Sequence, residues 1–314
     1  MLSSLSLSML ALLMAAGVAL DRLLGEPMRW HPLVGFGNVA KTVERRLNRG
    51  SLRYARGVFA WSVVVLPLVA LAWWLIDVSG HLGMVMHAVL LYFCIGLRSL
   101  RDHMLPIGQA LLNCDLPLAR SLTARIVSRD TERAAEPDLA KAAVESTLEN
   151  GNDAVFGALF WFVVAGGPGA LLFRLANTLD AMWGYRSERF LAFGWAAARI
   201  DDVLNWIPAR LTALSYTLLG DGRSAWHCWR TQAPAWPSPN AGPVMSAGAG
   251  ALGLVLGGEA QYDGVMEARP PLGMGRTAAA DDIRHAWHLV AKTAVLWIVL
   301  LAVTAFVIER ITHA

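Results

Sequence analysis

Long stretches without charge are the feature that most limits what this chain can fold into. Residues 1–20 contain no charged side chain, and residues 57–76 and 290–308 form two further apolar runs. A helix needs about 20 mostly apolar residues to cross a lipid bilayer. Only 16% of the 314 residues are charged, whereas soluble domains carry roughly 25%. We therefore predict an all-α, polytopic integral membrane protein whose residues 1–314 form a single membrane-embedded domain.

Three other segments are apolar but less clear. Residues 82–97 follow the run at 57–76 after a very short connection, which predicts the return leg of a helical hairpin. Residues 154–173 contain the sequence AGGPG at 165–169, which breaks a helix within a membrane unless protein or water covers the backbone. Residues 203–219 include polar side chains and a proline. Each of the last two segments could be a span, a re-entrant half-helix or a helix buried at the membrane face.

The distribution of basic residues orients the predicted spans. Residues 21–56 and 98–150 are rich in Lys and Arg, whereas the hairpin tip at 77–81 has none. The positive-inside rule then places the two basic segments in the cytoplasm and the N-terminus outside. No basic segment precedes the first apolar run, which favours a retained anchor over a cleaved signal peptide. The net charge of +3 is not gathered in one basic stripe, so nucleic acid is not an expected partner.

The cytoplasmic segment 116–150 has a helix-forming composition and ends in a series of acidic residues. Glu145, Glu149 and Asp153 are spaced by four, which places them on one helix face if the helix continues that far. Asn150 lies beside them. Like charges at this spacing repel, and Mg²⁺ is a suitable counter-ion because it binds carboxylates together with substrate phosphates. A solvated acidic face is the alternative interpretation.

Two later segments repeat the combination of acid and amide. Asn177 and Asp180 lie three positions apart, and Asp201 and Asp202 are followed by Asn205. Such groups are costly to bury next to membrane segments without partners, so we expect the three clusters to form the wall of one site. Arginines are interleaved with them and suit phosphate, or else pair with the aspartates. They are Arg174, Arg186, Arg199 and Arg210.

Cytoplasmic helices and loops rich in Gly and Pro are expected to complete the site. Ser238, Asn240 and Gly242 lie in a predicted rigid loop at 234–243, and Arg276 ends a second predicted glycine-rich loop at 270–276. The sequence has no phosphate-binding P-loop. Gly248, Gly250 and Gly253 satisfy G-x-G-x-x-G by count, but no strand precedes them, and close helix packing is the better explanation. His31, in a Gly-rich stretch, is the only histidine in a motif-like setting.

Six blocks of sequence, in order, resemble the adenosylcobinamide-phosphate synthase family (CobD/CbiB) of cobalamin biosynthesis. A collinear series is more specific than any one of its members. The blocks are DRLLGEPMRWHPLVGFG at 21–37, VESTLENGNDAVFGALF at 144–160, NTLDAMWGY at 177–185, ARIDDVLNWIPARLTAL at 198–214, SPNAGPVMSAGAGALGLVLGG at 238–258 and LGMGR at 272–276.

The resemblance implies an enzyme of the bacterial inner membrane with a cytoplasmic active site. Its expected activity is a carbon–nitrogen ligase reaction, in which adenosylcobyric acid is joined to (R)-1-aminopropan-2-ol or its O-phosphate through an amide. ATP is the expected co-substrate and Mg²⁺ the expected cofactor. The lipid bilayer and other membrane enzymes of cobalamin assembly are the candidate macromolecular partners.

The resemblance also suggests a role for each matched residue. The expected catalytic residues are Glu145, Glu149, Asp153, Asp201 and Asp202, and the expected metal ligands are Glu149, Asp153, Asp180 and Asp202. The substrate-binding set shares polar or small side chains suited to phosphate, corrin amides or the ammonium group. It comprises His31, Asn150, Asn177, Asp180, Arg210, Ser238, Asn240, Gly242 and Arg276.

Two other classes of membrane protein are weighed against a ligase. A Mg²⁺-dependent prenyltransferase would have two D-x-x-x-D motifs and about nine spans, but the adjacent Asp201 and Asp202 do not fit this spacing and the apolar runs are too few. A transporter subunit would place acids inside long apolar runs and show an internal repeat. The acids at 145–153 instead end a polar segment, and the sequence shows no repeat.

Overall fold

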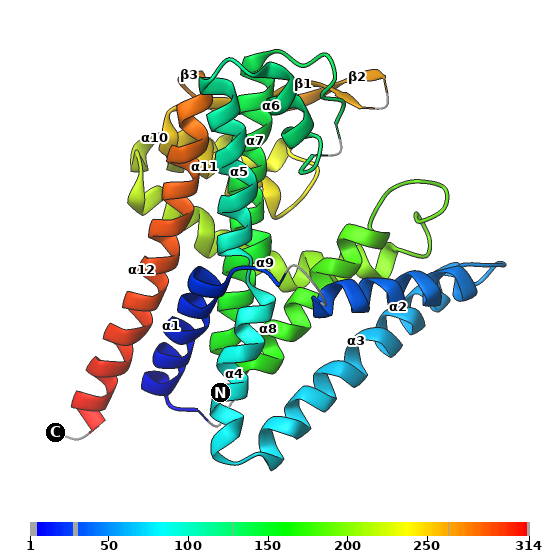
Figure 1. Ribbon diagram of the computed structural model, residues 1–314, viewed down its shortest axis with the longest axis vertical. Coiled ribbons are helices and arrows are strands. Elements are labelled where there is room, and N and C mark those ends of the chain that lie inside the picture. Colours follow the sequence, from blue (N-terminus) through cyan, green and yellow to red (C-terminus); the bar gives the residue numbers. More distant parts are fainter. Residues whose placement is uncertain (1–4, 28–30, 128, 263, 313–314) are drawn as a thin grey trace. The chain divides into compact units, whose positions relative to one another are not determined.

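The computed structural model describes residues 5–27, 31–127, 129–262 and 264–312, most of which are helical (Figure 1). The chain divides into two compact units. Unit 1 comprises Met1–Gly96, Asp153–Asn205 and Ile298–Ala314. Unit 2 comprises Leu97–Asn152 and Trp206–Trp297.

Unit 1 is built around a helical hairpin and a long bent helix. The hairpin predicted from the two apolar runs is present as α3 and α4, which turn at Gly80 with a φ of 55° (Figure 1). Ser6 begins the first helix by accepting a hydrogen bond from the amide of Met9, and Gly25 ends it. The helices are α1 (Leu7–Leu24), α2 (Pro32–Leu47), α3 (Arg53–Val78), α4 (His81–Cys94), the π-helix η1 (Asn152–Phe156), α8 (Gly157–Trp183) and the first part of α9 (Trp195–Leu219).

The glycine-rich break predicted at 165–169 is a kink within α8. Ala165 and Gly166 leave the helical conformation, and Gly166 has a φ of 65°. The amide of Gly167 donates a hydrogen bond to Nδ1 of His87, which lies on α4, at 2.8 Å. The interrupted segment is buried. Protein therefore covers the opened backbone, as a break inside an apolar segment requires.

The hydrophobic core of unit 1 joins α2, α3 and α8. Phe36, Trp61 and Leu179 are buried in it. The rings of Trp183 and Phe193 also meet there edge to face, with centroids 5.1 Å apart. This core fixes the end of α8 on which two of the predicted site residues lie.

Unit 2 contains shorter helices and a small sheet. Glu136, Pro137 and Asp138 form the first turn of α7, where the fixed φ of proline and acidic side chains at the positive end of a helix are favourable. Its helices are α5 (Leu97–Leu112), α6 (Leu116–Thr123), α7 (Glu136–Gly151), the end of α9, α10 (Gly222–Gln232), the short 3-10 helix η2 (Ala233–Ala235), α11 (Ala241–Leu252) and the start of α12 (Ala280–Thr312).

The sheet corrects the prediction of an all-α protein. Strands β1 (Leu254–Tyr262) and β2 (Val265–Gly273) form an antiparallel hairpin, and β3 (Arg276–Thr277) pairs with β1 in parallel, in the order β2-β1-β3. Most of the segment 270–276 is therefore strand and not loop. The sequence carries a signal for this hairpin, because Asp-Gly at 263–264 is a favoured two-residue connection between strands.

Small residues on α11 serve helix packing, as predicted. A Cβ on Gly248 would lie 2.8 Å from the side chain of Leu148, and one on Gly250 would lie 2.8 Å from backbone atoms of Ser224 and Ala225. Gly253 ends the helix in a left-handed conformation. The glycines let α11 approach α7 and α10 closely, which removes the reason to interpret them as a nucleotide motif.

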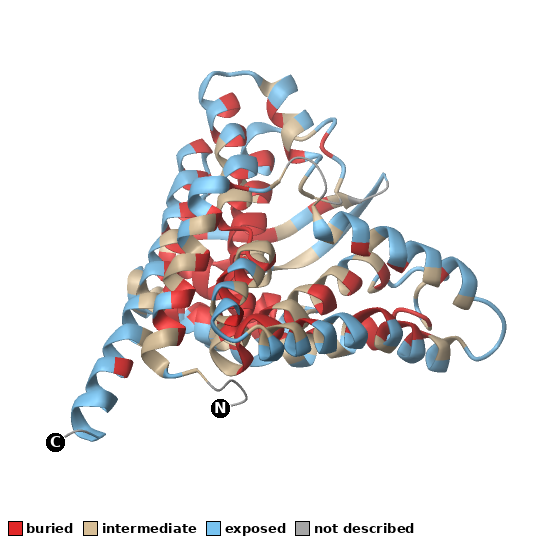
Figure 2. Cartoon of the chain, turned by 60° about the horizontal axis from the view of Figure 1, so that its bottom comes forward, coloured by how far each residue is buried: buried red, intermediate tan, exposed pale blue. Residues whose placement is uncertain are grey.

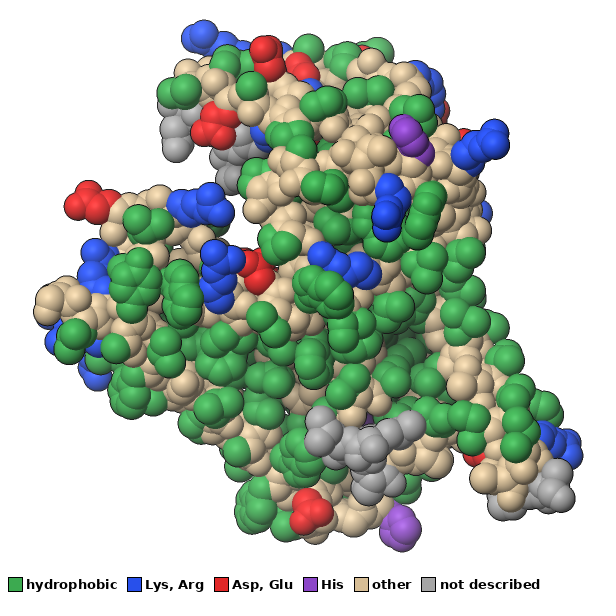
Figure 3. All heavy atoms as spheres, turned by 180° about the vertical axis from the view of Figure 1, so that it is seen from behind, with side chains coloured by type: hydrophobic (Ala, Val, Ile, Leu, Met, Phe, Trp, Pro, Cys, Tyr) green, Lys and Arg blue, Asp and Glu red, His purple; other side chains and the backbone are tan. Residues whose placement is uncertain are grey.

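Within the described residues, five helical segments are long and apolar enough to cross a membrane. The segment 203–219 is not among them. Large hydrophobic side chains are exposed over the face drawn in Figure 3, and the helix leading to the C-terminus is largely exposed in Figure 2. The fold is thus compatible with a membrane protein. The five segments are Leu7–Leu24, Arg53–Val78, His81–Leu112, Glu136–Trp183 and Ala280–Thr312.

Candidate functional site

Unit 1 brings together predicted site residues from η1, α8 and α9. We call Asp153, Asn177, Asp180, Asp201 and Asn205 the acid–amide cluster. Nδ2 of Asn205 donates to Oδ1 of Asp153 and to Oδ2 of Asp201, each at 3.2 Å. Nδ2 of Asn177 donates to Oδ1 of Asp201 at 3.3 Å. Asp180 is close enough to Asp201 and Asp153 to repel them. The amides thus hold carboxylates near one another.

Local helix geometry explains how these side chains meet. Asn177 and Asp180 are one turn apart on α8, and Asp201 and Asn205 are one turn apart on α9, so each pair shares a helix face. Asp153 lies in a π-helical turn, which contains an extra residue relative to an α-turn. The expected face shared by residues 145, 149 and 153 is therefore interrupted before the third residue. Such turns occur often at functional sites.

The environment of Asp201 disfavours its charge. Asp201 is only 8% exposed. Burial and the neighbouring carboxylates of Asp153 and Asp180 raise the pKa of Asp201 well above its usual value, although hydrogen bonds from Asn205 and Asn177 oppose the rise. A carboxyl with a raised pKa binds a proton more readily than an ordinary Asp, which is a property of a general base.

Asp202 faces a different set of neighbours. Burial raises the pKa of Asp202, and Arg199 opposes this rise from 3.4 Å. Arg174 lies near the other side chains: it interacts electrostatically with Asp153 and Glu26, and its buried Nε has no hydrogen-bond partner among the described residues. Positive charge is therefore placed beside the acids, as the interleaved arginines predict.

The part of the chain that the structure describes contains no closed metal cage. Among the described residues, no group of three or more His, Cys, Asp or Glu side chains is arranged to hold a metal ion. The acid–amide cluster is compatible with Mg²⁺ in a more open mode, because this ion commonly takes one or two carboxylates and completes its shell with water and substrate phosphates. Three of the predicted ligands, Asp153, Asp180 and Asp202, lie in unit 1. Glu149, the fourth, lies in unit 2.

A second group of predicted residues meets in unit 2 around the predicted loop at 234–243, whose two ends are helical in the structure, in η2 and in the first turn of α11. Nη1 of Arg210 donates to Oδ1 of Asn240 at 2.9 Å, and Nη2 donates to the carbonyl of Pro239 at 3.0 Å. Oγ of Ser238 accepts a hydrogen bond from the amide of Ala241 at 3.1 Å at the start of α11. A Cβ on Gly242 would lie 2.7 Å from a carbonyl oxygen of η2. The predicted substrate-binding residues here fix the shape of the loop.

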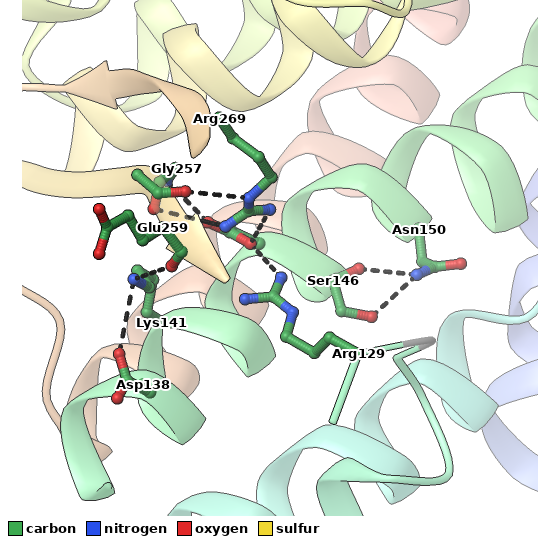
Figure 4. A network of polar contacts seen from close by, with 10 residues as sticks. Arg129, Asp138, Lys141, Ser146, Asn150, Gly257, Glu259 and Arg269 are labelled. Carbon is green, nitrogen blue, oxygen red and sulfur yellow. Dashed lines mark hydrogen bonds and ion pairs between the residues drawn. The ribbon is translucent and has the colours of Figure 1, made fainter. Parts of the chain in front are cut away.

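Glu145 is at the centre of a network that sequence reasoning did not foresee. Its carboxylate, only 3% exposed, is paired with Arg129 and with Arg269, which lies 3.1 Å away. It also accepts a hydrogen bond from the amide of Gly257 at 2.7 Å. Figure 4 shows Arg129 and Arg269 converging from opposite sides, with Gly257 nearby. These contacts join α7 to the β-hairpin, and a catalytic role for Glu145 stays a prediction.

The remaining predicted residues have local partners. Nδ2 of Asn150 donates to the carbonyl and Oγ of Ser146 at 2.9 and 3.0 Å (Figure 4). Arg276 forms a two-pronged ion pair with Asp282, with separations of 2.6 and 2.7 Å. His31 caps α2 by accepting a hydrogen bond from the Leu33 amide at 3.2 Å.

The cap also bears on the acid–base behaviour of His31. Burial lowers the pKa of His31 and Arg174 lowers it further, whereas Glu26 acts in the opposite direction. The neutral ring is the form that can accept the cap hydrogen bond at Nδ1. A structural role for His31 is thus visible in the fold.

The residues missed from the sequence are Arg129 and Arg269. Arg129 lies in an irregular segment before α7, and Arg269 lies on β2. The hairpin signal at 263–264 could have placed Arg269 on a strand, but its ion pair spans 124 positions and no local pattern encodes it.

Comparison with known proteins gives a consistent result. A profile of the CobD/Cbib protein family matches residues 14–290. A protein of Stutzerimonas stutzeri named "Cobalamin biosynthesis protein CobD" is 58% identical over 284 residues, covering 90% of this chain and 93% of its own. A protein of the same name from Chromobacterium violaceum is 52% identical over 311 residues, covering 97% and 99%. No solved structure matches the chain.

The family match and the alignments with these two relatives each cover most of the sequence. They agree with the resemblance carried by the six blocks, and the acid–amide cluster and the loop at 234–243 fall within the matched residues. The chain belongs to the CobD/Cbib family of cobalamin biosynthesis proteins.

Proposed function

We propose that this protein is an ATP-dependent amide ligase of the bacterial inner membrane. It joins the free carboxylate of adenosylcobyric acid to the amine of (R)-1-aminopropan-2-ol or its O-phosphate, and the product is adenosylcobinamide or its phosphate. The observation that carries the proposal is the acid–amide cluster of unit 1 in a chain of this family. Membership of the family supports a role in the corrinoid pathway. The acid and amide groups of the cluster are suited to binding an amine and a phosphate.

An amide does not form from a free carboxylate and an amine without activation. Transfer of the terminal phosphoryl group of ATP to the corrinoid carboxylate would give an acyl phosphate and ADP. The amine nitrogen then attacks the acyl carbon, the carbon–oxygen bond to phosphate breaks, and inorganic phosphate leaves. The amine must lose a proton in this sequence, so the site needs a base as well as groups that balance phosphoryl charge.

Asp201 has the properties of that base. Its pKa is raised by burial and by Asp153 and Asp180, so it binds a proton more readily than an ordinary Asp, as a general base must. Asn177 and Asn205 hold its two oxygens through hydrogen bonds, which fixes the direction in which a substrate ammonium could approach. We assign Asp201 the role of orienting the ammonium and accepting its proton.

Mg²⁺ fits the neighbouring acids in its open binding mode. Asp153 and Asp180 would hold the ion with phosphate oxygens of ATP, and the ion would supply charge stabilisation during phosphoryl transfer. The predicted participation of Glu149 and Asp202 belongs to the same proposal. Arg174 and Arg199 are placed beside Asp153 and Asp202, so they can balance phosphate charge once a substrate is bound.

The loop at 234–243 is proposed to contact the corrinoid. Arg210 holds Asn240 and Pro239 in place, and Ser238 fixes the start of α11. A rigid loop with amide, hydroxyl and backbone groups is suited to the many amide side chains of a corrin ring, because such a surface binds without losing much conformational entropy.

Reconstitution of the purified protein tests the reaction directly. The detergent-solubilised full-length chain is given ATP, Mg²⁺, adenosylcobyric acid and (R)-1-aminopropan-2-ol O-phosphate, and product is detected by mass spectrometry together with ADP. We expect formation of the amide and of ADP in equal amounts. Absence of corrinoid product from folded protein would reject the ligase assignment.

Variants test the site. Asp201→Asn and Asp153→Asn should each lower turnover by about 100-fold or more, as loss of a general base or of charge-stabilising groups does. Asp77→Asn, an exposed acid of the same unit, is the matched control and should retain activity. Equal activity of all three variants would remove the cluster from the reaction while leaving the family assignment intact.

A further inference from the structure

An open cavity of about 630 Å³ lies in unit 2 beside the first turns of α12. Its apolar part comes from different helices and includes Leu219, Leu252 and Leu289. Its polar part comes mainly from α12, where Arg284, His288 and Lys292 recur every four positions and so share one helix face. None of these three residues is part of the acid–amide cluster.

Positive charge is in excess in this cavity. Arg276, Arg284 and Lys292 line it together with a single acid, Asp282, which Arg276 neutralises at 2.6 Å. Arg284 is 3.3 Å from the exposed Asp281. Lys292 forms no ion pair with any acid among the described residues.

Histidines extend the basic character of the cavity. His285 and His288 both line it, and Arg284, His285 and Lys292 all act electrostatically on His288. Each imidazole can donate a hydrogen bond to an anion from at least one ring nitrogen. The cavity thus offers guanidinium, ammonium and imidazole donors around one space.

The cavity lies at the polar end of an apolar helix. The last apolar run of the sequence, residues 290–308, begins at the cavity, and the helix Ala280–Thr312 is long and apolar enough to span a membrane. Val295, less than one turn after Lys292, is 60% exposed. A ligand held here therefore contacts basic side chains at the start of α12 and an exposed apolar surface further along the same helix. That combination matches a molecule with an anionic head and an apolar tail.

We infer that this cavity binds a phosphate group, and that the phosphate belongs to the headgroup of an anionic phospholipid. Arg284, His288 and Lys292 would bind the phosphate oxygens, and the leucine side chains would contact the glycerol and the first methylene groups. Basic sites at the ends of transmembrane helices bind such headgroups through the negative surface potential of the membrane and through direct contacts. The inference does not rest on the proposed ligase reaction, although Arg276, one of the expected substrate-binding residues, also lines the cavity.

Lipid binding to the full-length protein in detergent tests the inference. Native mass spectrometry would compare bound phosphatidylglycerol with bound phosphatidylcholine for the wild type and for R284Q/K292Q. We expect the wild type to prefer phosphatidylglycerol and the double variant to bind it about 20-fold more weakly, as loss of two basic residues near a headgroup predicts. Thermal unfolding of both proteins would show that the exposed substitutions leave the fold intact.

A matched control separates the cavity from general attraction between charges. R223Q/R230Q removes the same charge from exposed positions on α10 and should leave phosphatidylglycerol binding unchanged. Equal binding by the wild type and R284Q/K292Q, or an equal loss in both double variants, would overturn the inference.

A competition experiment identifies the source of the phosphate. Inorganic phosphate should not displace phosphatidylglycerol if the apolar floor contributes to binding. If instead inorganic phosphate binds in an Arg284- and Lys292-dependent manner and the wild type shows no lipid preference, the cavity is a phosphate site for a soluble compound, and the lipid source is rejected.

Discussion

Asn205 donates a hydrogen bond from Nδ2 to Oδ1 of Asp153 at 3.2 Å, although 52 positions separate the two residues. The same nitrogen is 3.2 Å from Oδ2 of Asp201. One neutral amide therefore connects two carboxylates that would otherwise repel. It holds the acids near each other without neutralising them, which leaves their negative charge available to a cationic ligand.

The bridging amide should be required for both stability and activity. Asn205 is only 1% exposed, so Asn205→Ala should lower the free energy of unfolding by about 1–3 kcal/mol through loss of buried hydrogen bonds. Ligase turnover should fall more than the stability change alone explains. Thermal unfolding in detergent and the product assay measure the two effects. Asn113→Ala, at an exposed position, is the control, and equal stability of the two variants would contradict the bridging role.

The raised pKa of Asp201 predicts a definite dependence of stability on pH. The folded protein retains the proton of this carboxyl at pH values where the unfolded chain has lost it. Stability should therefore fall as pH rises from the ordinary Asp pKa, about 3.9, through the raised pKa of the folded state. Asp201→Asn should flatten this part of the profile and make the protein more stable at neutral pH.

Thermal unfolding across the pH range measures this contribution. The activity of Asp201→Asn should fall although its stability rises, because the same buried charge that destabilises the fold serves the reaction. Asp77→Asn, which removes an exposed acid, should leave the shape of the profile unchanged. An Asp201→Asn profile parallel to that of the wild type would show that the environment of Asp201 does not perturb its titration.

Features encoded locally were predictable from the sequence. The apolar runs predict the α3–α4 hairpin, and Pro137 marks the start of α7 as proline in a first helical turn does. The glycines of α11 were interpreted as packing residues, which Gly248 and Gly250 confirm. In each case the sequence signal lies within one helical segment or one turn, where residue propensity and spacing determine the local structure directly.

Features that depend on distant packing were not predictable. The π-turn at 152–156 changes the face on which Asp153 lies, and no spacing rule for an α-helix reveals it. The pairing of Glu145 with Arg269 joins a helix to a strand 124 positions later. The hairpin itself was missed although its turn sequence is favourable, because the glycines around it were assigned to loops.

The network around Glu145 should act mainly through the β-hairpin. Glu145→Gln removes the carboxylate that faces Arg129 and Arg269, and breaking one partner of a buried ion pair costs about 3–5 kcal/mol. Amide hydrogen exchange in residues 254–273 should become faster. Glu259→Gln, at an exposed position on β1, should leave exchange unchanged. If Glu145→Gln keeps the hairpin protected but abolishes turnover, Glu145 is a catalytic residue, as the family resemblance of the sequence implies.

Close packing of α11 against α10 predicts opposite effects for two glycine substitutions. A Cβ on Gly250 would lie 2.8 Å from backbone atoms of Ser224 and Ala225, which cannot move aside as a side chain can. Gly250→Ala should therefore lower stability by about 1–3 kcal/mol. Gly35, on α2, has no atom within 4 Å of the same position, so Gly35→Ala should raise stability by about 0.5–1 kcal/mol through helix propensity. Thermal unfolding of the two variants measures both effects. Higher stability of both variants would show that helix propensity, and not the contact between α10 and α11, determines the response at Gly250.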